Sequence, residues 1–69
     1  MLSSVIRHYR YDSARRVLDV TFVSGRRYAY QDVPAKIAAA MDVSFSKGEF
    51  FNSHIRPYYH FTRLSVAAA

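Results

Sequence analysis

Apolar and polar side chains alternate most clearly in Arg16–Val23, where Leu18, Val20 and Phe22 occupy every second position. Successive side chains of a strand point to opposite faces, so this spacing predicts a strand with one face in the core and one in water. Val5–Tyr11, rich in β-branched and aromatic residues, predicts a strand before it. The turn-forming segment between them then makes the pair antiparallel.

Arg26–Gln31 predicts a third strand, and the loop before it decides where its tyrosines point. A two-residue loop would place arginine beside the apolar face of the second strand. A three-residue loop, Val23-Ser24-Gly25, puts glycine at the left-handed position of a type I turn with a bulge. We therefore expect the longer loop, with Tyr28 and Tyr30 directed into the core. The predicted pairs are Phe22 with Arg26, Val20 with Tyr28, and Leu18 with Tyr30.

The first strand shows a break in its alternation. Ile6 and Tyr9 fall on opposite faces unless one extra residue is inserted between them. A β-bulge near Arg7-His8 would turn Ile6, Tyr9 and Tyr11 inward together. We therefore expect a bulge at that point.

The chain after the third strand favours a helix. Val33-Pro34 ends the sheet, because proline has no N–H to donate to a ladder. Pro34–Met41 is rich in alanine, and proline suits the first turn of a helix. Ile37 and Met41 stand four residues apart and therefore share one face.

A second helix is predicted from a capping box formed by Ser46 and Glu49, in which each residue bonds to the backbone of the other. The helix should run to about residue 55 or 56 and end before Pro57. Tyr58–Leu64 is aromatic and is expected to pack back onto the domain.

The predicted fold class is α+β, with a three-stranded antiparallel β-meander followed by two short α-helices packed on one face. A chain of 69 residues is enough for one domain only. We place that domain at residues 1–64 and expect residues 65–69 to form a flexible C-terminal tail. The predicted core consists of Leu18, Val20, Phe22, Tyr28, Tyr30, Ile37, Phe51 and Ile55.

Ten Lys+Arg against five Asp+Glu give a net charge of +5, and eight of the ten cations are arginine. The planar guanidinium pairs with phosphate through two hydrogen bonds and stacks on bases, which the lysine ammonium cannot do. This excess favours nucleic acid as a partner. Excess charge also serves simply to keep a small domain soluble.

Several classes of function are disfavoured. Without cysteine the chain has no disulfide or thiolate zinc site, and the spacing of His8, His54 and His60 matches no metal motif. Two glycines provide no phosphate-binding loop, and no nucleophile–base pair stands out. No signal peptide is evident, and no apolar run approaches the roughly 18 residues of a membrane span. We expect a cytoplasmic, non-enzymatic protein that binds no cofactor, metal or membrane.

The ordered pattern resembles the KTSC domain, whose central mark is a Y-x-Y motif, here Tyr28-Ala29-Tyr30. The resemblance extends from about Ser4 to Tyr59. It implies a relation both to free-standing small bacterial proteins, the form this chain resembles, and to the C-terminal extension of certain lysyl-tRNA synthetases. The synthetase context implies RNA binding. The matching residues are Leu18-x-Val20-x-Phe22-x-x-Gly25-x-x-Tyr28-x-Tyr30-x-x-Val33-Pro34 and Ser46-x-Gly48-x-Phe50-Phe51-x-x-x-Ile55.

Two functions remain open. The first is RNA binding, to tRNA-like or single-stranded RNA, through arginine–phosphate contacts and an interleaving of arginine with aromatic residues near the C-terminus. Tyr28 and Tyr30 would stack on bases if exposed, but the loop argument favours the core. The second is a protein-interaction module or homodimer that uses the open sheet face or an edge strand. The candidate nucleic-acid-binding residues are Arg10, Arg26, Arg27, Arg56, Arg63 and Tyr58.

Overall fold

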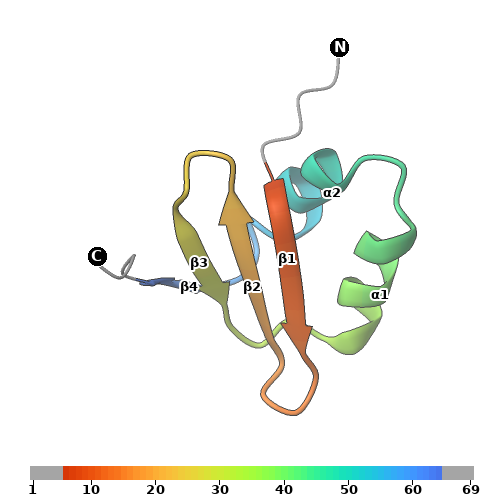
Figure 1. Ribbon diagram of the computed structural model, residues 1–69. Helices are drawn as coiled ribbons and strands as arrows, with labels where there is room; N and C mark the ends of the chain where they lie inside the picture. The colour runs from red at the N-terminus through yellow and green to blue at the C-terminus, as the bar shows by residue number, and fades with distance from the viewer. Residues whose placement is uncertain (1–5, 65–69) are drawn as a thin grey trace.

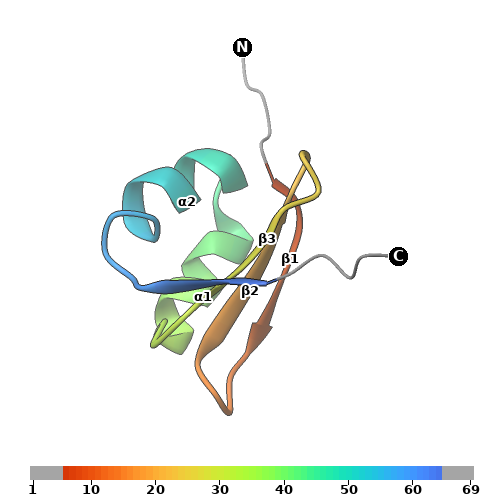
Figure 2. The ribbon, with the colours of Figure 1, turned by 90° about the vertical axis from the view of Figure 1, so that its left-hand side faces the viewer.

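The computed structural model describes residues 6–64, so the predicted tail at 65–69 lies outside the described residues. The four strands form one antiparallel sheet in the order β1-β2-β3-β4. Both helices lie on the same side of this sheet (Figures 1 and 2), which confirms the α+β class. The elements are β1 (Ile6–Asp12), β2 (Val17–Phe22), β3 (Arg27–Tyr30), α1 (Ala35–Val43), α2 (Lys47–His54) and β4 (Phe61–Leu64).

The prediction of three strands is wrong, because β4 adds a fourth. Tyr28 of β3 lies opposite Arg63, and Tyr30 lies opposite Phe61. This strand escapes a pattern-based prediction because it sits at the sheet edge with its first three residues exposed. An arginine also occupies one of its helix-facing positions, so no apolar alternation marks it.

The predicted three-residue loop between β2 and β3 is confirmed. Gly25 has a φ of +95° and donates its N–H to the Phe22 carbonyl at 2.8 Å. The Phe22 N–H in turn donates to the Arg26 carbonyl at 2.9 Å. Leu18 therefore lies opposite Tyr30, and Val20 opposite Tyr28, as the loop length requires.

The predicted bulge in β1 is confirmed as well. Ile6 pairs with Phe22 while His8 pairs with Thr21, so the register shifts between Ile6 and His8. Beyond the shift, Tyr9 lies opposite Val20 on the helix side of the sheet. The extra residue thus brings the apolar side chains of β1 onto the face that the helices cover.

The helix ends follow their local chemistry. Pro34, with a φ of −65°, is the N-cap of α1, and the helix continues to Val43 rather than ending at Met41. At α2 the Ser46 hydroxyl accepts a hydrogen bond from the Glu49 backbone N–H at 3.2 Å. This confirms the serine half of the capping box. No return bond from the Glu49 side chain occurs in the described part of the chain.

The core lies between the sheet and the helices, with Phe51 of α2 at its centre. The Phe51 ring meets Tyr30 edge-on at 5.2 Å and Phe22 at 5.5 Å between centroids. Five of the eight predicted core residues are buried, whereas Phe22, Tyr28 and Ile37 are only partly buried. The buried cluster comprises Ile6, Leu18, Val20, Tyr30, Val33, Met41, Phe51 and Ile55.

Tyr9 ties β1 to α1, because its hydroxyl donates to Asp42 Oδ1 at 2.6 Å. Burial and this hydrogen bond raise the pKa of Tyr9 from 10.0 to about 12. The folded protein therefore holds a proton that the unfolded chain releases between these values. The stabilisation is fully present below about pH 10 and is lost as the pH rises towards 12.

We expect the ultraviolet titration of tyrosinate to show this late phenol. Tyr9→Phe should remove one phenol from the titration near pH 12, and Asp42→Asn should lower the pKa of Tyr9. A late part of the curve that is identical in Tyr9→Phe and the parent would contradict the assignment.

Candidate nucleic-acid interface

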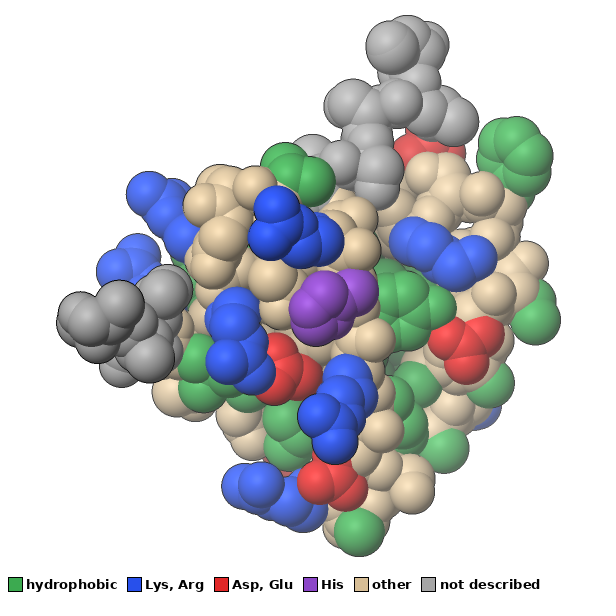
Figure 3. All heavy atoms as spheres, in the orientation of Figure 1, with side chains coloured by type: hydrophobic (Ala, Val, Ile, Leu, Met, Phe, Trp, Pro, Cys, Tyr) green, Lys and Arg blue, Asp and Glu red, His purple; other side chains and the backbone are tan. Residues whose placement is uncertain are grey.

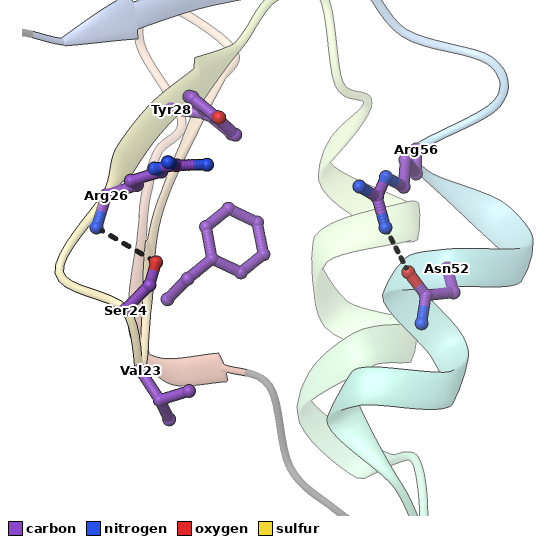
Figure 4. Close-up of a pocket in the computed structure, with 7 residues that line it drawn as sticks. Val23, Ser24, Arg26, Tyr28, Asn52 and Arg56 are labelled. Atoms are coloured by element: carbon purple, nitrogen blue, oxygen red, sulfur yellow. Dashed lines mark hydrogen bonds between the residues drawn. The ribbon is translucent and has the colours of Figure 1, made fainter.

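A cavity of about 300 Å³ lies between the β2–β3 hairpin and α2 (Figure 4). Its walls combine apolar rings with two guanidinium groups and a carboxamide, and no acidic side chain lines it. The hairpin supplies one wall and the C-terminal end of α2 supplies the other. The lining residues are Phe22, Val23, Ser24, Arg26, Tyr28, Asn52 and Arg56.

The hairpin geometry places Arg26 in this cavity. Arg26 lies two residues before Tyr28 in the strand direction, so both side chains leave the sheet on the helix side. Its backbone N–H donates to Ser24 Oγ at 3.4 Å, within the loop. Figure 4 shows its side chain reaching from the hairpin towards α2.

Arg56 faces the same cavity from the end of α2. Its Nη1 donates to Asn52 Oδ1 at 3.1 Å, a bond between side chains four residues apart. Figure 4 shows the Arg56 guanidinium turned towards the hairpin, so that it and Arg26 approach one space from opposite sides. Two segments distant in sequence thus bring two positive charges together.

Within residues 6–64, no carboxylate pairs with the two guanidinium groups of this cavity. Among the described residues the one ion pair is Arg27–Asp19, at 2.9 Å on the other side of the sheet. The positive charge of Arg56 also affects the pKa of a buried tyrosine in the core. Burial raises the pKa of Tyr30, and the positive charge of Arg56 opposes that increase. The site is therefore electropositive and suited to an anion.

Aromatic rings continue from the cavity across β3 to β4. The Tyr28 ring meets Phe22 at 5.3 Å on one side and Phe61 at 4.9 Å on the other. Phe61 is 51% exposed, and Arg63 lies opposite Tyr28 in the β3–β4 ladder. We call Arg26, Arg56, Arg63, Tyr28 and Phe61 the arginine–aromatic surface.

Arg10 and Arg27, also predicted as candidates, lie on the opposite, open face of the sheet. Arg10 is opposite Asp19 in the β1–β2 ladder, and the Arg27 guanidinium bonds to Asp19. Figure 3 looks onto this face and shows basic side chains interspersed with acidic ones and a histidine. The open face is therefore a mixed-charge surface, and it does not join the cavity.

Tyr58 is 73% exposed in the turn after α2, and its ring contacts no other ring in residues 6–64. Sequence reasoning missed Phe61 and Asn52 as members of the site, and for Tyr28 it favoured a place in the core over contact with RNA. Phe61 could be found only by recognising β4, and Asn52 only by knowing which side of α2 faces the hairpin. The six predicted residues therefore do not form one site. The arginine–aromatic surface contains Arg26, Arg56 and Arg63, the open face contains Arg10 and Arg27, and the turn after α2 contains Tyr58.

No group of three His, Asp or Glu side chains gathers as a metal site within residues 6–64. Over the same residues, no helix is both long and apolar enough to cross a membrane.

The sequence matches the KTSC domain over residues 2–59. The chain belongs to the KTSC family. It is 36% identical over 62 residues to a lysine–tRNA ligase of Trichormus variabilis and 34% identical over 62 residues to that of Nostoc sp.. Each alignment covers 90% of this chain and 11% of the ligase, so the chain spans only a small part of those enzymes. The predicted resemblance is confirmed.

Other KTSC relatives are of similar size. An uncharacterised protein of Stutzerimonas stutzeri is 35% identical over 63 residues, which covers 90% of this chain and 89% of that protein. The crystal structure of a KTSC domain protein from Yersinia pestis superposes with a TM-score of 0.85 at 28% identity. It covers 93% of this chain and 92% of its own, so the fold described above is a KTSC fold.

The family match contains only part of the arginine–aromatic surface. Arg26, Tyr28 and Arg56 fall within residues 2–59, whereas Phe61 and Arg63 of β4 follow them. The cavity is thus built from KTSC-matching segments, and β4 adds a ring and a cation beside it.

Proposed function

We propose that this KTSC domain is a non-catalytic RNA-binding module that contacts RNA through the arginine–aromatic surface. The observation that carries the proposal is the convergence of Arg26 and Arg56 on one cavity without an acidic side chain in its lining. Guanidinium groups bind phosphate oxygens through paired, charge-assisted hydrogen bonds. Nucleic acid is the polymer that offers such phosphates beside rings that can stack.

The relatives support this choice of partner. The two lysine–tRNA ligases that match this chain are enzymes whose substrate is an RNA. In those enzymes the matching domain shares its chain with the part that acts on this RNA. We extend this to the present chain as part of the proposal.

The cavity also supports binding rather than catalysis. Its lining holds no histidine, carboxylate, lysine or cysteine that could transfer a proton or attack a substrate. Ser24 is the one hydroxyl nucleophile of the lining other than the Tyr28 phenol, and its Oγ accepts a bond from the Arg26 backbone. Because no general base stands among the described residues that line the cavity, this serine has no group there to activate it.

The proposal predicts a salt-dependent affinity for RNA. The logarithm of the association constant should fall linearly with the logarithm of salt concentration, with a slope of about −0.7 per phosphate contacted on a single strand. Three arginines on the surface would give a slope near −2. Arg26→Gln with Arg56→Gln should flatten that slope to about −0.7 and weaken binding at low salt. Fluorescence anisotropy with labelled tRNA and single-stranded RNA measures both quantities.

A matched control removes the same charge from the other side of the sheet. Arg10→Gln with Arg27→Gln also lowers the net charge by two, but changes only the open face. For this double variant, the slope of the logarithm of the association constant against the logarithm of salt concentration should stay close to that of the parent. Equal losses in both double variants would show that only net charge matters and that the arginine–aromatic surface is the wrong site. No binding at about 50 mM salt, where phosphate contacts are strong, would reject RNA binding itself.

The second candidate is a protein-interaction module, favoured by one exposed apolar segment. Phe45, between the two helices, is 97% exposed, and the neighbouring Val43 is 84% exposed. The open sheet face and the β1 edge fit such a role less well. Charged side chains and a bulge at an edge disfavour the addition of another strand. A negative result with RNA would make this candidate the leading one.

A further inference from the structure

The cavity is smaller than a surface that would contact only an extended RNA backbone. At about 300 Å³ it lies at the lower end of the range for pockets that enclose a small ligand. Its two walls come from the hairpin and α2, so a group that enters it is contacted from two sides. This size suits a single nucleotide unit rather than a whole helical groove.

The ring beside the cavity is held in a fixed position with part of its surface in water. The Phe61 ring packs against the rings of Tyr28 and Tyr30, with distances of 4.9 and 5.4 Å between ring centroids. It is also fixed through the backbone by its pairing with Tyr30. Because 51% of Phe61 remains exposed, the ring offers a preordered platform on which a planar base can stack.

The polar groups of the cavity complement a nucleotide. Asn52 uses its Oδ1 to accept a bond from Arg56, and within residues 6–64 its Nδ2 has no hydrogen-bond partner. That carboxamide therefore offers a neutral donor beside two guanidinium groups. Phosphate on the arginines and a neutral acceptor on Asn52 would use all three groups.

We propose that this site takes one unpaired nucleotide of single-stranded RNA, with its phosphate between Arg26 and Arg56 and its base against Phe61 and Tyr28. The inference rests on the RNA-binding function proposed above and specifies the substrate class. Bases within an RNA duplex are stacked and paired, so their faces cannot reach a ring on the protein. A splayed, unpaired base can stack its face on such a ring. The domain therefore selects single strands over duplexes.

The test compares a single-stranded RNA of about eight nucleotides with a blunt duplex of the same length, by anisotropy at one salt concentration. The parent should bind the single strand at least about tenfold more tightly, since the stacked base adds an interaction that the duplex lacks. Phe61→Leu, which keeps an apolar side chain but removes the ring, should lower single-strand affinity about five- to 100-fold. It should leave duplex affinity unchanged. Tyr58→Leu is the control, because it removes an exposed ring that lies outside the surface.

A second measurement needs no variant. A strand that carries the fluorescent adenine analogue 2-aminopurine should change its emission when the parent protein binds, because the base exchanges stacking on its neighbours for stacking on an aromatic ring. Equal binding of single strand and duplex, or unchanged emission on binding, would overturn the unpaired-nucleotide inference while RNA binding stands. Absence of binding to either RNA would overturn both proposals. The two failures are therefore distinguishable.

Discussion

Replacing Phe51 by alanine is expected to lower the free energy of unfolding by about 3–5 kcal/mol, one of the largest losses any single substitution in this domain should cause. Phe51 is fully buried and joins α2 to the sheet through ring contacts with Phe22 and Tyr30. Deleting a buried phenylalanine costs about 3–5 kcal/mol. A domain of 69 residues has roughly 3–10 kcal/mol of unfolding free energy in total, so this loss removes from about a third to all of it. Urea unfolding followed by circular dichroism measures the change.

Phe45→Ala is the matched control for this prediction. It makes the same substitution six positions earlier in the chain, on a side chain that is 97% exposed. Its free energy of unfolding should stay within about 0.5 kcal/mol of the parent. Similar urea midpoints for the two variants would mean that Phe51 does not occupy the centre of the core.

The second large effect separates the two tyrosines of the Y-x-Y motif. Tyr30 is 1% exposed and packs against Phe51 and Phe61, so Tyr30→Ala should cost about 3–5 kcal/mol. Tyr28 is only partly buried and lines the cavity. Tyr28→Ala should therefore cost less, roughly 1–2 kcal/mol, and leave a folded protein.

Urea unfolding of the two alanine variants under one set of conditions tests this difference. The folded Tyr28→Ala variant should also bind single-stranded RNA more weakly than the parent, because it removes part of the wall beside Arg26. Equal destabilisation by the two substitutions would place Tyr28 in the core and remove it from the arginine–aromatic surface.

Much of the fold was predictable where the deciding chemistry is local. Gly25, together with the position of the neighbouring arginines, selects the loop length, and the loop length then determines the pairing of Tyr28 and Tyr30 across the sheet. The break in alternation between Ile6 and Tyr9 likewise predicts the bulge from a short stretch of sequence. Each of these features depends on a few neighbouring residues and on steric rules.

The rest depends on contacts between distant segments. Sequence alone could not show that α2 packs so that Arg56 faces Arg26, since the two residues belong to different elements. It also grouped Arg26 with Arg27, although adjacent strand residues point to opposite faces. The structure separates them, with Arg26 at the cavity and Arg27 paired to Asp19.

The long connection between β3 and β4 has a consequence for the order in which the sheet forms. The first three strands are joined by short turns, whereas Gln31 and Thr62, which bond across the β3–β4 edge, are 31 residues apart in sequence. Closing this larger loop, which contains both helices, costs more chain entropy than closing the short turns. Because its first three residues are exposed, we expect β4 to be the last strand to dock and the first to detach. The Phe61 platform is therefore ordered only while β4 stays paired with β3, and local opening of β4 would remove it without unfolding Phe51 and the rest of the core.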